Sequence, residues 1–124
     1  MIYTLNVPAA ADYRPRFVVR RSDRIPVVLD RFAPLREATA AAILESTGAV
    51  PADVRRAIAA GKPPDDLAAL VQKIRSRAYT VTDQDVDALK GRYTPDQLFE
   101  IIVAAAFGAA AERLAAARRA LEDA

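Results

Sequence analysis

The sequence predicts an all-α fold in which six helices follow an extended N-terminal arm. Apolar residues recur three and four positions apart along most of the chain, the spacing that places side chains on one face of a helix. Between these segments stand residues that start helices, namely Ser, Thr, Asp and Pro, and glycines that end them. With 124 residues, 52% of them hydrophobic and 27% charged, the chain is expected to comprise an arm over 1–22 and a single helical domain over 23–124.

Three helices are expected in the first half of the domain. The first covers 23–32, because Pro26 falls in the first turn, where proline is tolerated. The second runs from Pro34 to about residue 47, with Gly48 as its terminator, and the third begins at Pro51 and stops at Gly61. Their apolar faces are formed by Ile25, Val28, Leu29 and Phe32, then by Leu35, Ala38, Ala42 and Ile43, and then by Val54 and Ile58.

The second half predicts three more helices. Acidic residues at 65 and 66 begin the fourth, an extended stretch follows over 79–81, and Thr82 caps a short fifth helix that Gly91 ends. Thr94 and Gln97 have the spacing of a capping box, so a long last helix is expected to run to about residue 121. The inward-facing residues are Leu67, Leu70, Val71, Ile74 and Ala78 in the fourth helix and Val86 and Leu89 in the fifth.

The chain has no cysteine and no histidine, which excludes disulfides, thiolate or imidazole catalysis and zinc-thiolate sites. No cofactor is expected, and the cytoplasm is the default location. Asp83, Asp85 and Asp87 suggest a hard cation, but the glycine and terminal glutamate of a calcium loop are missing, so they are interpreted as helix-start acids and no metal is expected. The longest apolar stretch, 101–111, is too short to cross a membrane.

Two stretches, 78–86 (AYTVTDQDV) and 93–101 (YTPDQLFEI), together with the alanine-rich helix that follows, resemble the alkylhydroperoxidase D-like (AhpD-like), or carboxymuconolactone decarboxylase-like, superfamily. The resemblance covers roughly residues 65–121. It implies an all-helical orthogonal bundle of six helices that assembles into homo-oligomers. In peroxidase members it also implies a redox C-x-x-C pair with a nearby Glu and His.

The redox residues of that family are largely missing here. The family spacing, aligned on Glu37, places the two cysteines and the histidine at Ala49, Ala52 and Arg56, so Glu37 alone matches. The leading hypothesis is therefore a non-peroxidatic, oligomeric structural or partner-binding protein.

Glu37, Arg56 and Glu100 are the candidate site residues for an alternative, a thiol-independent decarboxylase- or lyase-like enzyme acting on a small carboxylate. Glu100 begins an apolar stretch and has two interpretations: a partly buried base with a raised pKa, or an ionised first-turn acid. Glu37 either pairs with an arginine, such as Arg56 or Arg113, or is exposed on its helix.

Positive charge is concentrated between Arg14 and Arg36, a segment that contains seven arginines and only two acidic residues, Asp23 and Asp30. Arginine binds phosphate well, so a third hypothesis is that this region binds nucleic acid. The absence of a recognisable reading element favours a protein partner or a neighbouring subunit instead. The arginines are Arg14, Arg16, Arg20, Arg21, Arg24, Arg31 and Arg36.

Overall fold

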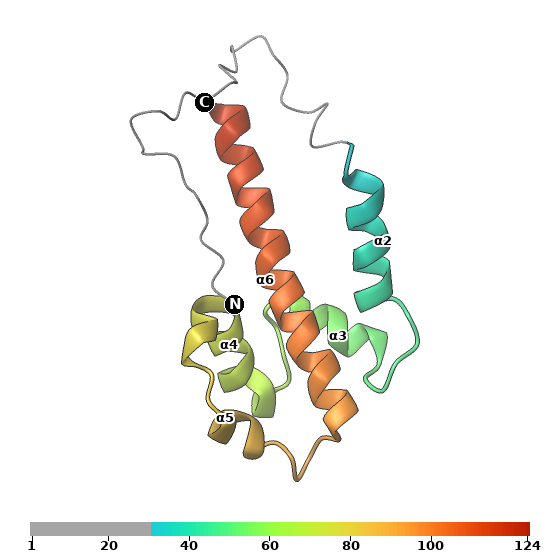
Figure 1. Cartoon of the computed structure of the whole chain (residues 1–124), viewed down its shortest axis with the longest axis vertical. Helices are drawn as coiled ribbons and strands as arrows, with labels where there is room; N and C mark the ends of the chain where they lie inside the picture. Colours follow the sequence, from blue (N-terminus) through green and yellow to red (C-terminus); the bar gives the residue numbers. More distant parts are fainter. Residues whose placement is uncertain (1–30) are drawn as a thin grey trace, which may run out of the picture.

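The computed structural model describes residues 31–124, and this part of the chain is helical, without a strand (Figure 1). The predicted arm over 1–22 and nearly all of the predicted helix over 23–32 lie outside the described residues. The α-helices are α2 (Ala33–Leu44), α3 (Ala52–Ala59), α4 (Ala68–Arg77), α5 (Asp83–Asp87) and α6 (Pro95–Asp123), and two short 3-10 helices are η2 (Asp65–Leu67) and η3 (Ala78–Thr80).

Helix α6 is the central element. Its 29 residues give it a length of about 43 Å at 1.5 Å per residue. Helices α3 and α4 pack against its first half, whereas α2 runs antiparallel beside its second half (Figure 1). The predicted capping box is confirmed, because the Thr94 hydroxyl accepts a hydrogen bond from the Gln97 N–H, and the Gln97 side chain accepts one from the Thr94 N–H.

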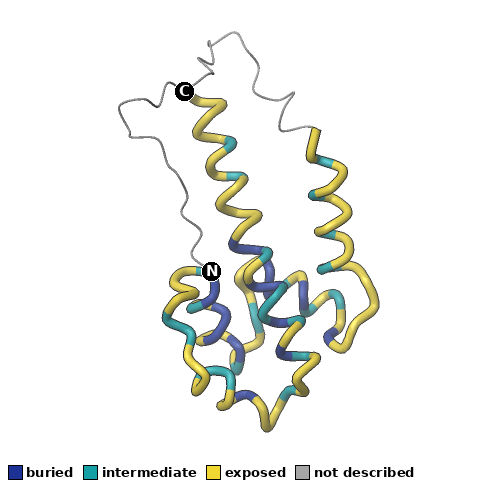
Figure 2. The backbone as a smooth tube through the Cα atoms, viewed as in Figure 1, coloured by how far each residue is buried: buried dark blue, intermediate teal, exposed yellow. Residues whose placement is uncertain are grey.

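The hydrophobic core occupies one end of the molecule. Figure 2 shows the buried residues gathered in α3, α4 and the first half of α6, while α2 and the second half of α6 carry exposed or half-buried residues. Helices α3 and α6 approach closely at Gly108, where an added Cβ would overlap the backbone carbonyl group of Ala59 in α3. The main core residues are Val50, Ile58, Leu67, Leu70, Val71, Ile74, Leu89, Leu98, Ile101, Ala104 and Ala105.

Several predicted helix ends hold in the structure. Gly61 follows α3 with φ of 77°, the left-handed conformation that favours glycine. Thr82 caps α5 in a second capping box with Asp85, whose carboxylate also lies 2.9 Å from the Lys73 ammonium. Within the described helices, none is long and apolar enough to cross a bilayer.

Other predicted boundaries are wrong. Residues 79–81 were expected to be extended, and Val81 is, but 78–80 form η3, because the Thr80 hydroxyl and the Val81 N–H both bond back to carbonyls of the preceding turn. Helix α2 ends at Leu44 rather than near residue 47, and α5 ends at Asp87 rather than at residue 91. Neither Gly48 nor Gly91 has a positive φ, so neither acts as a left-handed terminator.

Candidate functional site

Glu100, in the second turn of α6, binds the loop between α2 and α3. Its Oε1 accepts a hydrogen bond from the Ala49 N–H at 2.8 Å, and its Oε2 accepts one from the Val50 N–H at 2.7 Å. These two bonds, with a smaller contribution from the positive charge of Arg55, lower the pKa of Glu100 below its ordinary value. The interpretation of Glu100 as a base with a raised pKa is therefore wrong, because N–H donors stabilise its ionised form.

Arg55 in α3 binds the same loop from the inside. Its side chain is buried, with 3% of the residue exposed, and its nitrogens donate to backbone carbonyls of the loop and of the last turn of α2. The Nε–H bonds the Val50 carbonyl at 3.1 Å and one terminal nitrogen bonds the Ile43 carbonyl at 2.6 Å, while the other reaches the Ser46 carbonyl. A buried cation is thus solvated by backbone oxygens.

Arg55 was not among the predicted site residues, whereas its neighbour Arg56 was. A signal was present, since Arg55 stands three and four positions before Ile58 and Ala59, both of which are buried. An arginine on the apolar face of a helix either reaches past that face to water or finds acceptors inside. Here it finds acceptors in the α2–α3 loop.

Arg55 and Glu100 converge on a small cavity of about 180 Å³, which Ser46 and Phe99 also line. This is below the roughly 300 Å³ at which small-molecule sites usually begin. Both Glu100 oxygens bond the loop, and all three Arg55 guanidinium nitrogens bond carbonyls of the loop or of the last turn of α2. The two side chains therefore act as a clamp that fixes the position of α3 relative to α6; we call them the Arg55–Glu100 clamp.

The other two predicted site residues lie apart from this clamp. Arg56 is exposed and pairs with Glu45 at 2.8 Å. Glu37 is exposed on α2 and makes no hydrogen bond or ion pair within residues 31–124. Arg113, the other arginine suggested for Glu37, donates to the backbone carbonyl of Arg75 instead. The structure thus does not bring Glu37, Arg56 and Glu100 into one site.

The acidic residues of α5 are used locally. Asp85 caps the helix and binds Lys73, and Asp87 pairs with Lys90 at 2.6 Å. Side-chain hydrogen bonding to Lys73 is the main cause of the lowered pKa of Asp85. In the described part of the chain, no group of three or more Asp, Glu, His or Cys side chains is placed to hold a metal ion.

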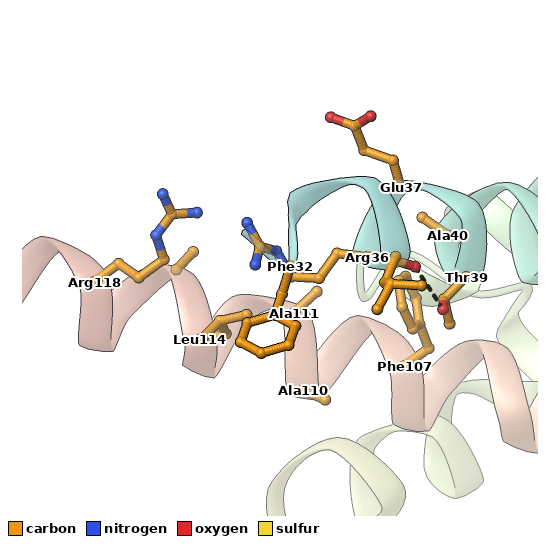
Figure 3. Close-up of a pocket in the computed structure, with 12 residues that line it drawn as sticks. Phe32, Arg36, Glu37, Thr39, Ala40, Phe107, Ala110, Ala111, Leu114 and Arg118 are labelled. Carbon is orange, nitrogen blue, oxygen red and sulfur yellow. Dashed lines mark hydrogen bonds between the residues drawn. The ribbon is translucent and has the colours of Figure 1, made fainter. Parts of the chain in front are cut away.

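The larger opening lies between α2 and the second half of α6. It has a volume of about 530 Å³, and we call it the α2–α6 groove (Figure 3). Of the predicted apolar face of α2, Leu35 lines this opening and is 65% exposed, whereas Ala42 and Ile43 line the small cavity beside the Arg55–Glu100 clamp. No residue of α2 is buried. The apolar and small side chains around the groove include Phe32, Leu35, Ala40, Phe107, Ala111 and Leu114.

Charged side chains stand along the rim of the α2–α6 groove. Figure 3 shows Glu37 toward the Phe107 end and Arg118 at the opposite end, with both side chains directed to the same side. The Nε–H of Arg118 is buried and has no acceptor among the described residues. A buried donor without an acceptor costs free energy, so the Nε–H of Arg118 is an unsatisfied group on this rim.

No protein-family model matches the chain, and no curated protein or solved structure shows significant similarity to it.

Proposed function

We propose that this chain is a non-peroxidatic, oligomeric structural or partner-binding protein of the alkylhydroperoxidase D-like type. One observation carries the proposal: α2 and the second half of α6 present an apolar surface that nothing in residues 31–124 covers. Contiguous apolar surface of this kind marks interaction sites in proteins. The proposal keeps the cytoplasmic location suggested by the lack of cysteine.

The exposed side chains on this surface are large as well as numerous. Phe32 is 47% exposed, Leu35 65%, Leu114 39% and Leu121 50%. Helices in water owe most of their stability to packing of one face, and a helix of 12 residues such as α2 is marginal alone. Covering the apolar face of α2 in an assembly supplies the packing that residues 31–124 do not provide.

The enzymatic alternative has one observation in its favour, the convergence of Glu100 with an arginine, which is Arg55 rather than Arg56. Three facts support a structural role for this pair instead. The pKa of Glu100 is lowered, both its oxygens are bonded to the loop, and the cavity beside it is small. A general base needs a pKa near the working pH and a free oxygen that reaches the substrate.

The arginine-rich region remains part of the proposal as a second contact with a neighbouring subunit or protein partner. Of the seven arginines, the described residues include Arg31 and Arg36. The Arg31 guanidinium lies 5.4 Å from the centre of the Phe32 ring. Nucleic-acid binding stays the less favoured hypothesis, and it would show a steep loss of affinity with salt.

The proposal is tested by two measurements on the full chain. Sedimentation velocity between about 1 and 500 µM, a range that brackets a micromolar dissociation constant, should show a mass that rises with concentration. Incubation with cumene hydroperoxide and dithiothreitol should give no protein-dependent peroxide loss. A monomer at every concentration, or peroxide turnover, contradicts the proposed function.

A further inference from the structure

We propose that the α2–α6 groove is one half of a two-fold interface, in which a second copy of this chain packs groove to groove. In this arrangement Glu37 of each copy pairs with Arg118 of the other. The inference rests on the proposed function and names both the surface and the partner.

Charge complementarity favours a second copy as the occupant. Glu37 and Arg118 stand at opposite ends of the α2–α6 groove and are directed to the same side (Figure 3). A two-fold axis through the middle of the groove exchanges its ends, so the acid of each copy meets the base of the other. In a symmetric interface residue i contacts j and j contacts i, which makes this surface complementary to itself.

Neither charged group is satisfied within the described chain. Glu37 has no hydrogen-bond or ion-pair partner among residues 31–124, and the buried Nε–H of Arg118 has no acceptor there. A carboxylate of the second copy that approaches the terminal nitrogens of the Arg118 guanidinium would form a charge-assisted hydrogen bond, which is stronger than a neutral one. Pairing therefore gives the Glu37 carboxylate of each copy a partner.

The shape of the groove permits close approach. Its lining includes four alanines, Ala40, Ala110, Ala111 and Ala115, which let a neighbouring helix come near the backbone. Leu35 and Leu114 project from α2 and α6 and are partly exposed. Across a two-fold axis, the leucines of one copy can fill the space that the alanines of the other leave.

The size of the surface sets the strength of the dimer. The 12 residues of α2 span about 18 Å, and two helices side by side are about 20 Å wide, which gives a face of about 360 Å² in projection. Typical stable interfaces bury about 800 Å² of accessible surface on each partner, so this interface is smaller than a typical stable one and belongs with weak, transient complexes. We expect a dissociation constant in the micromolar range.

Charge reversal provides the test, using sedimentation velocity on the full chain. Glu37→Arg and Arg118→Glu should each raise the dissociation constant of the dimer at least tenfold. Each variant places like charges at positions 37 and 118 opposite one another, once on either side of the two-fold axis. The double variant should restore wild-type association. Leu35→Glu should abolish it, and because Leu35 is 65% exposed, the circular dichroism of this variant should stay that of the folded protein.

Asp65→Arg is the matched control. It makes the same change of charge as Glu37→Arg, but Asp65 is an exposed residue of η2 and does not line the groove. This variant should dimerise like the wild type. If the wild type associates and the Glu37, Arg118 and Leu35 variants associate equally well, the inference is wrong while the proposed function stands. A wild type that is monomeric at all concentrations overturns both.

Discussion

Replacing Glu100 by glutamine tests the Arg55–Glu100 clamp most directly. The wild-type carboxylate accepts two backbone N–H groups, one on each oxygen, at 2.8 and 2.7 Å. Glutamine keeps the size of the side chain but has one oxygen, and its amide nitrogen cannot accept a hydrogen bond. One loop N–H therefore loses its acceptor, and the other exchanges a charged acceptor for a neutral one.

The expected cost follows from the burial of the loop. Val50 is 5% exposed, so its N–H cannot turn to water when its acceptor is lost, whereas Ala49 is exposed and partly compensated by solvent. An unsatisfied buried donor costs about 1–3 kcal/mol, and a charged acceptor adds to the strength of a bond. We expect Glu100→Gln to lower the free energy of unfolding by about 2 kcal/mol, which for a chain of this size lowers Tm by roughly 5–10 °C.

Urea unfolding at several pH values, followed by circular dichroism, is the assay. The pKa of Glu100 is lower in the folded state than its ordinary value of 4.5. Its contribution to stability is then fully present above about pH 4.5 and is lost as the pH falls through the folded-state pKa. The difference between wild type and Glu100→Gln should be constant from pH 6 to 8 and should shrink below pH 4.5.

The control is Glu122→Gln, an exposed position on the same helix, which should change stability by no more than about 0.5 kcal/mol. Equal stability of the wild type and Glu100→Gln at pH 7 would refute the clamp. So would a difference that grows as the pH is lowered, because it would mean that the pKa of Glu100 is raised and that the carboxyl group is better suited to act as a base.

Three further substitutions test the packing around the clamp and along α6. Gly108→Ala should lower the free energy of unfolding by about 3 kcal/mol, because the new Cβ overlaps the Ala59 carbonyl. This cost exceeds the roughly 1 kcal/mol that alanine gains over glycine in helix propensity. A variant that is more stable than the wild type in urea would contradict this. Gly48→Ala places a Cβ 2.5 Å from Glu100 Oε1. It should lower the free energy of unfolding by about 1–2 kcal/mol in the wild type but by under about 0.5 kcal/mol in a Glu100→Ala background, where the contact is gone. If the two substitutions lower the free energy of unfolding additively, the contact is disproved. Arg55→Lys should cost about 2–4 kcal/mol, since one ammonium cannot reach three carbonyls, and an unchanged urea midpoint would show that the bonds do not matter.

The parts of the fold that the sequence predicted well depend on local interactions. The capping box of Thr94 and Gln97 involves residues three apart, and the left-handed turn at Gly61 depends on one residue. The apolar stripe of α4 also follows directly from helical spacing, although Ala78 at its end is exposed. In each case the residues that determine the local structure stand within a few positions of it in the sequence.

The Arg55–Glu100 clamp could not be predicted in the same way. Glu100 bonds N–H groups that stand 50 and 51 positions earlier in the chain, and only the packed fold brings them together. Glu100 stands out in the sequence as a carboxylate at the start of an apolar stretch, but the sequence does not distinguish a buried base from a hydrogen-bonded acid. The apolar face of α2 was visible in the sequence, but the sequence does not show that no helix within residues 31–124 covers it.

The position of α6 at the end of the helical order has a consequence for synthesis on the ribosome. Helices α2, α3 and α4 all pack against α6, and α3 and α4 contact its first half. While the chain emerges, the apolar residues of α3 and α4 therefore have no complete core until Leu98–Ala109 has left the exit tunnel. Folding is then expected to be nearly all-or-none and late, and nascent chains stalled before this point should be sensitive to protease and bound by chaperones.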